Sequence, residues 1–250
     1  MASKLRADEL LFESGLVESR AMAQKLILAG QVFEESGSLV DKPSRLFAAT
    51  CKFHVKQPAR YVSRGGEKLE GFFEVYGEPL AGKRALDIGA STGGFSDFLL
   101  QHGVATVTCV DVGRGQLHYK LRSDGRVTCM EGVNARQLSK FLPNAEPFDV
   151  AVIDLSFISL KKILEEAWGL LAVGGLLVAL IKPQFEATKK EASRCKGVIG
   201  DGAVRSRVRM EIRDFILANL PNANVIAEVQ SPISGADGNL EFFIGVRKIS

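Results

Sequence analysis

Residues 84–95 constrain the fold of this chain most, because an apolar run, a glycine-rich turn and a helix start follow one another there. The apolar run carries Asp87 near its end, and the turn contains Gly89, Gly93 and Gly94. Glycine lets the backbone approach a ligand closely, and the helix start adds exposed N–H groups. The spacing is Gly-x-x-x-Gly-Gly, so the Gly-x-Gly-x-x-Gly fingerprint of dinucleotide sites is absent. The segment therefore predicts a nucleotide-type site without a pyrophosphate cradle.

A second acid, Asp111, follows the next apolar run at 104–110. In open α/β sheets, a carboxylate at this place binds ribose hydroxyls. S-adenosylmethionine contains an adenosine but no pyrophosphate. The two acids and the glycine spacing therefore favour S-adenosylmethionine as the cofactor.

From residue 80 onward, apolar strand-like runs alternate with helical segments, which include 159–170 and 203–220. This alternation predicts an α/β fold with a mostly parallel sheet covered on both faces. The last two runs are joined by a loop, so the final strand is expected to be antiparallel. The result is a seven-stranded Rossmann-like methyltransferase sheet, preceded by a small α+β domain. The predicted strands are 84–88, 104–110, 126–130, 148–155, 174–182, 223–230 and 240–247.

Composition sets few limits on function. A net charge of +3 permits nucleic-acid binding without arguing for it. The chain starts without the apolar core of a signal peptide, and its longest uncharged run, 168–181, is shorter than the ~20 residues of a spanning helix. We therefore expect a cytoplasmic protein with no membrane partner. The cysteines are expected to be reduced thiols rather than disulfide or zinc ligands, and no metal is predicted; they are Cys51, Cys109, Cys129 and Cys195.

The first 56 residues have a different texture and predict a separate small domain. Pro58 then breaks the chain, so residues 57–66 are interpreted as a linker and residues 67–250 as the larger domain. Within the small domain, the pattern predicts helices at 4–14 and 19–30, a hairpin over 32–40 and a strand at 52–56.

This amino-terminal segment resembles the RNA-binding domain named after ribosomal protein S4. The matching motifs are Arg-x-Asp at 6–8, Gly-Leu-Val at 15–17, Ser-Arg at 19–20, Gly-x-Val at 30–32 and Asp-Lys-Pro-Ser at 41–44. The alternative is a small helical domain with ordinary solvated charges. The resemblance implies RNA contacts by Arg6, Arg20, Lys25 and Lys42, to which we add Arg64.

Polar groups follow the predicted strands at one edge of the sheet, where ligands bind in such folds. Lys182 closes a strongly apolar strand, and a buried lysine requires carboxylate partners. Asp154 and Glu241 are the candidates, because an antiparallel last strand would present Glu241 on the same edge.

Residues 80–247 resemble the FtsJ-type RNA ribose 2′-O-methyltransferases, and the whole chain resembles their TlyA (haemolysin A-like) branch. The motifs that carry the resemblance are at 61–69, 87–95, 154–159, 182–186 and 241–243. The resemblance implies a catalytic set of Lys68, Asp154, Lys182 and Glu241.

The resemblance also implies contacts with S-adenosylmethionine, in which Asp111 holds the ribose and Asn134 lies at the adenine edge. Phe157 and Phe185 could stack on a flipped base or could be core residues. The basic loop at 189–197 could follow phosphates or could simply be solvated. The expected cofactor contacts are Asp87, Gly89, Ala90, Ser91, Gly93, Phe95, Asp111, Val112, Asn134 and Asp154.

Methyl transfer to a ribose hydroxyl requires alignment of oxygen, carbon and sulfur and the removal of one proton. Lys182 is the candidate for orienting the 2′-hydroxyl. A neutral Lys182 could also accept the proton, whereas a protonated Lys182 would only steer the hydroxyl, and the sequence leaves both options open.

The resemblance implies S-adenosylmethionine-dependent 2′-O-methylation of ribose in ribosomal RNA, with cytidine as the target nucleotide. Ribosomal RNA or ribosomal subunits are the expected partners, and no obligate protein partner is evident. Two alternatives stand beside this prediction. One is an RNA-binding assembly factor with a degenerate methyltransferase domain, and the other is a haemolysin.

Overall fold

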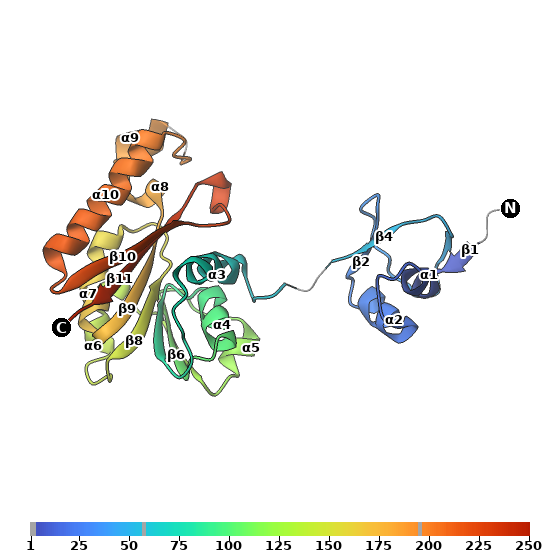
Figure 1. Ribbon diagram of the computed structural model, residues 1–250, viewed down its shortest axis with the longest axis horizontal. Helices are drawn as coiled ribbons and strands as arrows, with labels where there is room; N and C mark the ends of the chain where they lie inside the picture. The colour runs from blue at the N-terminus through green and yellow to red at the C-terminus, as the bar shows by residue number, and fades with distance from the viewer. Residues whose placement is uncertain (1–3, 57–58, 195–196) are drawn as a thin grey trace. The chain divides into compact units, whose positions relative to one another are not determined.

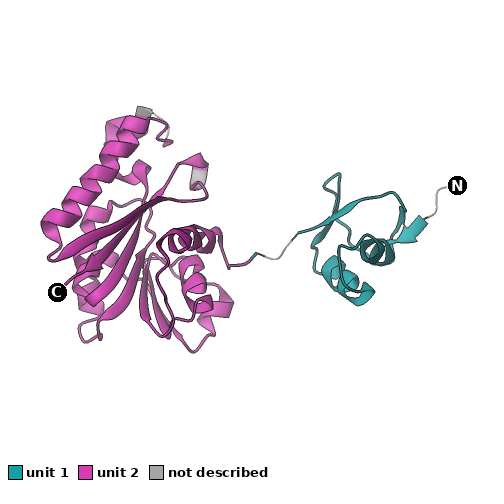
Figure 2. Ribbon diagram, viewed as in Figure 1, with its two compact units in different colours: residues 1–59 teal, residues 60–250 magenta. Residues whose placement is uncertain are grey.

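The computed structural model describes residues 4–56, 59–194 and 197–250, so Cys195 lies outside the described residues. The chain divides into two compact units, Met1–Ala59 and Arg60–Ser250 (Figure 2). Cys51, Cys109 and Cys129 are free cysteines. No helix in the described ranges is long and apolar enough to cross a membrane.

The first unit packs two helices against short strands. Its buried core is formed by Ala7, Leu10, Leu11, Ala23, Ile27, Val32, Val40, Phe47 and Phe53. In chain order its elements are β1 (Lys4–Arg6), α1 (Ala7–Glu13), α2 (Arg20–Leu28), β2 (Val32–Glu34), β3 (Leu46–Ala48) and β4 (Phe53–Val55).

The start of this unit differs from the prediction of a helix over 4–14. Residues 4–6 are extended, because β1 pairs antiparallel with β3 and Leu5 lies opposite Phe47. The sequence pattern did not predict β3, and a pairing between segments 42 residues apart overrides the local helical periodicity. The second helix does begin as predicted, since Ser19 Oγ accepts a hydrogen bond from the Met22 N–H at 3.2 Å.

The second unit contains one seven-stranded sheet in the order β10-β11-β9-β8-β5-β6-β7 (Figure 1). The seven predicted strands and the antiparallel direction of the last one are confirmed, since β11 is antiparallel to both β9 and β10. The strands are β5 (Arg84–Ile88), β6 (Thr106–Asp111), β7 (Val127–Glu131), β8 (Phe148–Ile153), β9 (Leu171–Ile181), β10 (Ala223–Gln230) and β11 (Phe242–Lys248).

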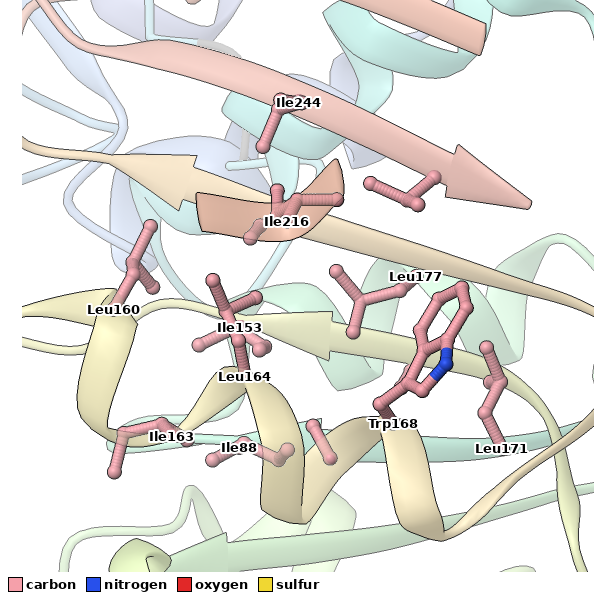
Figure 3. Close-up of a cluster of buried hydrophobic side chains, with 14 of the residues drawn as sticks. Ile88, Ile153, Leu160, Ile163, Leu164, Trp168, Leu171, Leu177, Ile216 and Ile244 are labelled. Carbon is pink, nitrogen blue, oxygen red and sulfur yellow. The ribbon is translucent and has the colours of Figure 1, made fainter. Parts of the chain in front are cut away.

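Helices cover both faces of this sheet, and each face has its own apolar core (Figure 1). One face carries α3 (Arg64–Tyr76), α4 (Gly94–Gln101) and α5 (Tyr119–Arg122). The other carries α6 (Leu138–Phe141), α7 (Leu164–Gly169) and α10 (Gly202–Asn219). Figure 3 shows this second core, in which Trp168 from α7 and Ile216 from α10 lie over Leu177 of the sheet. The shorter helices α8 (Pro183–Glu186) and α9 (Lys189–Arg194) follow β9.

The segment interpreted as a linker differs from the structure at its second half. Helix α3 begins at Arg64, and Tyr61 is buried in the core of the second unit. The backbone N–H of Val62 donates to Asp97 Oδ2 at 2.8 Å. Residues 60–66 therefore belong to the second unit, and residues 57–58 lie outside the described residues. The predicted helix at 159–170 is also interrupted, with a 3₁₀ turn at Leu160–Lys162 before α7.

Phe72 tests the packing of α3 on the sheet, because it is fully buried and its ring lies 5.7 Å from that of Phe243 on β11. Phe72→Ala should lower the free energy of unfolding of the second unit by about 3–5 kcal/mol, through lost transfer energy and a residual cavity. Trp168 is the single tryptophan, so its fluorescence during urea unfolding reports on this unit. Val75→Ala, on the exposed side of the same helix, is the control. Equal effects of the two substitutions would contradict the assigned packing.

Candidate active site

Two cavities lie at the carboxyl ends of the parallel strands and share Gly89 and Ser156. The first has a volume of about 260 Å³ and the second about 250 Å³. Residues lining the first are Ser63, Arg64, Gly65, Lys68, Asp87, Gly89, Ala90, Ser91, Thr92, Gly94, Phe95, Asp154, Ser156 and Lys182. Residues lining the second are Gly89, Val110, Asp111, Val112, Val133, Asn134, Ala135, Arg136, Leu155, Ser156, Phe157 and Ile158.

The four predicted catalytic residues form two ion pairs. Lys182 Nζ lies 2.5 Å from Asp154 Oδ1 and also donates to Ser156 Oγ at 3.2 Å. Lys68 Nζ donates to Glu241 Oε2 at 2.6 Å. The sequence suggested Asp154 and Glu241 as partners of Lys182. In the structure Lys182 pairs with Asp154, as predicted, whereas Glu241 pairs with Lys68. The reason is α3, whose second turn brings the Lys68 ammonium to Glu241.

The two pairs differ in their access to the first cavity. Lys68, Asp154 and Lys182 line it. Glu241 is only 2% exposed and does not belong to the lining of this cavity in the described part of the chain. The loop before β11 covers Glu241 closely, because a Cβ at Gly235 would lie 2.0 Å from Glu241 Oε1. Glu241 is therefore connected to the cavity through its ion pair with Lys68.

Asp87 is a fully buried carboxyl group on β5 that faces the first cavity. Ser96 Oγ donates to its Oδ2 at 2.6 Å, while its Oδ1 has no hydrogen-bond partner among the described residues. Burial raises the pKa of Asp87 to about 7, and the negative charges of Asp154 and Asp111 act in the same direction, against the Ser96 hydrogen bond. One carboxylate oxygen is thus available to a ligand donor.

Close packing within the chain requires glycine at two positions of the loop. Gly89 has φ +86°, and a Cβ there would lie 2.3 Å from the Asp154 carbonyl oxygen. Gly93 has φ +95°, and a Cβ there would lie 2.1 Å from the Leu121 side chain on α5. Gly93 was predicted to contact the cofactor, but among the described residues the cavity is lined by its neighbour Gly94 instead. Helix packing therefore accounts for glycine at position 93.

Asp111 is fixed by backbone donors beside the second cavity. Its Oδ2 accepts from the Ser91 N–H at 2.8 Å and its Oδ1 from the Gly113 N–H at 2.7 Å. Val112 and Asn134 line the same cavity, as predicted from the strand ends. Asn134 Oδ1 accepts from the Arg136 N–H at 3.1 Å, which caps a short 3₁₀ turn.

Sequence reasoning missed several lining residues, notably Ser63, Gly65, Thr92 and Ser156. Ser63 precedes the first turn of α3, and a Ser-Arg-Gly-Gly helix start beside the lysine motif was the available signal. Arg64 was predicted as an RNA contact and lines the first cavity.

Phe157 occupies the loop after β8 and is 90% exposed, which excludes it from the core. Its φ of +65° is unfavourable for a bulky side chain. Its ring lies 5.0 Å from that of Phe185, which is half-buried. Glu186 ties this loop to α8, because it accepts from Ser159 Oγ at 2.6 Å and from the Leu160 N–H at 2.7 Å.

The basic residues predicted to contact RNA in the first unit are partly charge-paired. Arg6 lies 2.9 Å and Arg20 3.7 Å from Asp8. The hydrogen bonds from Arg6 lower the pKa of Asp8 to about 2. Lys25 and Lys42 are exposed to solvent.

Among the described residues of the predicted basic loop, Lys189 and Lys190 form no ion pair, whereas two arginines further along the chain, in α10, are paired. Arg207 pairs with Glu191 and Glu211, and Arg209 pairs with Glu228. Cys195 and Lys196 of the predicted loop lie outside the described residues.

The seven-stranded sheet with its reversed last strand, together with polar cavities at the strand ends, defines a Rossmann-like methyltransferase. The family described as FtsJ-like methyltransferase matches residues 61–248, and the chain belongs to this family.

Relatives of the whole chain agree with this assignment. The chain is 42% identical over 239 residues to "Hemolysin A" of Brachyspira hyodysenteriae, covering 95% of this chain and 98% of that one. It is 38% identical over 249 residues to "16S/23S rRNA (cytidine-2'-O)-methyltransferase TlyA" of Mycobacterium tuberculosis, covering 99% and 91%. A solved structure from Streptococcus thermophilus is 37% identical, with a TM-score of 0.73 and coverage of 100% and 90%.

The buried Lys68–Glu241 pair predicts a specific pattern of stability. Glu241→Ala should lower the free energy of unfolding by about 3–5 kcal/mol, because it leaves the Lys68 ammonium buried without a counter-ion. The double variant Lys68→Met/Glu241→Leu should recover most of this loss, since an apolar pair of similar volume carries no desolvation cost. Urea unfolding of both variants and the parent protein measures the difference. A double variant as unstable as Glu241→Ala would show that loss of packing, rather than an unpaired charge, causes the defect.

Proposed function

We propose that the chain transfers a methyl group from S-adenosylmethionine to a ribose 2′-oxygen, with a cytidine in ribosomal RNA as the target. The observation that carries this proposal is the grouping of Lys68, Asp154 and Lys182 around one cavity that opens beside a second cavity of nucleoside size. The mycobacterial relative, 38% identical across nearly the whole chain, is named as an rRNA (cytidine-2'-O)-methyltransferase, which supports the substrate and the position of the methyl group.

The two cavities fit S-adenosylmethionine in charge and hydrogen bonding. The unpartnered Oδ1 of Asp87 would accept a hydrogen bond from the amino group of the methionine portion. Ser63 and the N–H groups in the first turn of α3 would bind its carboxylate. Asp111 would accept from the ribose hydroxyls on its remaining lone pairs, with Asn134 at the adenine edge. When bound, the cofactor supplies a methyl group activated by the positive charge on its sulfur.

The residues of the tetrad position the hydroxyl and manage its proton. Asp154 and Ser156 hold the Lys182 side chain from two directions, so its Nζ has a defined place in the cavity. From there it contacts the 2′-oxygen and fixes the direction of its lone pair. Such alignment of reactants can contribute roughly 7–11 kcal/mol to the lowering of a barrier. A neutral Lys182 accepts the proton of the 2′-hydroxyl as the oxygen takes up the methyl group, and Asp154 balances the ammonium that forms. Lys68, fixed by Glu241, adds a positive charge that stabilises the oxygen as its proton leaves.

RNA binding in this proposal involves both units. The first unit supplies Arg6, Arg20, Lys25 and Lys42, in agreement with its resemblance to the S4 domain. Phe157 supplies an exposed aromatic surface next to the second cavity, on which a base flipped out of the RNA can stack.

Lys182→Ala tests the proposed reaction. The purified protein is incubated with tritium-labelled S-adenosylmethionine and ribosomal subunits that lack the modification. The parent protein should place label in RNA at an alkali-resistant dinucleotide, which marks a ribose 2′-O-methyl group. Lys182→Ala should lose roughly 10²–10⁴-fold in rate, the usual range for a group that manages a proton, while cofactor affinity changes little.

Lys140→Ala, which removes an exposed lysine elsewhere in the second unit, is the matched control and should keep full activity. Label in alkali-sensitive nucleotides would indicate base methylation instead, and absence of label from the parent protein would contradict the proposed substrate.

Cofactor affinity should depend on pH through Asp87, whose pKa is raised to about 7. Only the ionised carboxylate attracts the cofactor's ammonium group, so affinity should fall by up to tenfold for each pH unit below about 7. In the absence of ligand, the free energy of unfolding depends on pH with the opposite sign, so it falls as the pH rises. The contribution of Asp87 is fully present below about pH 4, the ordinary pKa of an aspartate, and is lost as pH rises through about 7.

Calorimetric titration across pH 5.5–8.5, a range chosen to span about one and a half units on either side of pH 7, measures this dependence. Asp87→Asn should bind weakly at every pH and abolish the slope. 5′-Methylthioadenosine lacks the amino group and is the ligand control, for which the slope should be absent. Equal slopes for both ligands would assign the effect to another group.

A further inference from the structure

The first unit presents a short row of aromatic and apolar side chains on the outer face of its β2–β4 sheet, in which His54 is exposed and Phe33 half-buried. In the antiparallel register Phe33 lies opposite His54, and the neighbouring pairs place Val32 and Phe53 on the inner, buried side. The rings of Phe33 and His54 are stacked, with centroids 5.5 Å apart and planes 16° apart. Leu39, 45% exposed, extends the row, because it forms a β-bridge to Phe33.

Two lysines flank this row on the same face. Lys52 and Lys56 stand two residues on either side of His54, and the ladder continues to both, with hydrogen bonds from the Glu35 N–H to the Lys52 carbonyl and from the Lys56 N–H to the Gln31 carbonyl. Side chains two residues apart share a face, so both lysine side chains start from the outer side, with their Cα atoms about 13 Å apart. Neither lysine pairs with a carboxylate in the described part of the chain, although Glu35 opposite Lys52 offsets part of its charge.

We propose that this face, formed by Phe33, Leu39, His54, Lys52 and Lys56, binds a single-stranded segment of the RNA substrate. One unpaired base stacks on the Phe33–His54 pair, and the phosphates on either side of that base approach the two lysines. Stacked aromatic rings between cations are the usual arrangement of single-strand sites, because every base has a π-face and every linkage carries a negative charge. The inference rests on the proposed function for the kind of substrate, and it adds a contact surface separate from Arg6, Arg20, Lys25 and Lys42.

The surface can be tested with the full chain and a single-stranded oligoribonucleotide that carries one 2-aminopurine. The fluorescence of 2-aminopurine is quenched when it stacks on an aromatic ring. His54→Thr, a β-branched replacement at an exposed position, should lower the affinity roughly 5- to 150-fold, the loss expected for one base stack, and relieve the quenching. Phe33→Leu should act in the same way and keeps apolar volume at a half-buried position.

The lysines predict a separate salt signature. Lys52→Ala and Lys56→Ala should each reduce the slope of log affinity against log salt concentration by about 0.7, the value for one phosphate contact in a single strand. Lys140→Ala in the second unit is the charge-matched control and should leave the slope unchanged. A change of slope equal to that of the control would overturn the proposed phosphate contacts.

The same variants separate this inference from the proposed function. Circular dichroism first checks that His54→Thr and Phe33→Leu are folded. If both variants then bind and quench the oligonucleotide like the parent protein while ribosomal subunits are still methylated, the proposed binding surface is wrong and the proposed reaction stands. If the parent protein quenches the oligonucleotide and His54→Thr does not, the surface stands even when no label reaches ribosomal RNA. Failure of the parent protein to bind or quench the oligonucleotide overturns the surface as well.

Discussion

Pairing of buried charges at one edge of the sheet is the constraint on which the site depends. A charged group removed from water costs several kcal/mol unless an opposite charge and hydrogen bonds compensate it. Lys68 and Glu241 satisfy each other across 173 residues of sequence, and Lys182 is satisfied by Asp154 from the adjacent strand. Each pair therefore links two different elements, and the position of both ammonium groups is set by a partner on another element.

The reversed last strand makes this pairing possible. A strand that runs antiparallel to its neighbour begins at the edge where the neighbour ends, and Phe242 of β11 lies opposite Ile181 of β9. The residues next to this register pair, Glu241 and Lys182, consequently meet at the same edge. A parallel strand would carry Glu241 to the opposite edge, where Lys68 would have no counter-ion. The antiparallel direction of β11 thus determines which charged residues meet at this edge of the sheet.

Much of this architecture could be predicted because buried parallel strands leave strong local signals. The runs at 84–88 and 148–155 are largely apolar, and their charged residues lie near the two ends of each run. Long-range pairing leaves no such signal. The amino-terminal β1 was read as helix because its partner β3 lies far along the chain. The pairing of Glu241 with Lys68 rather than with Lys182 depended likewise on where α3 packs, which no spacing within the motif reveals.

Individual site residues show the same limit. Asp111 ends β6 and Asn134 lies three residues beyond β7, and both line the second cavity, as expected for residues at strand ends. The packing of Leu121 against Gly93 could not be predicted, since a glycine needed for a positive φ looks the same in sequence whether a ligand or a side chain fills the adjacent space. Ser63 was missed because its place depends on the exact start of α3. Helix boundaries are among the least reliable features of any sequence-based prediction.

Carboxylates outside the reaction also shape the site by holding strained backbone. Ser91 and Phe157 have positive φ and line the first and second cavity respectively. A non-glycine residue in this conformation costs about 1–3 kcal/mol. Asp111 accepts the N–H of Ser91, and Glu186 accepts two donors from the loop that carries Phe157. Hydrogen bonds to charged acceptors contribute about 1.5–3 kcal/mol each, which is enough to offset that strain. The cavities can therefore keep their shape before any ligand enters, because the hydrogen bonds to Asp111 and Glu186 offset the strain at Ser91 and in the Phe157 loop.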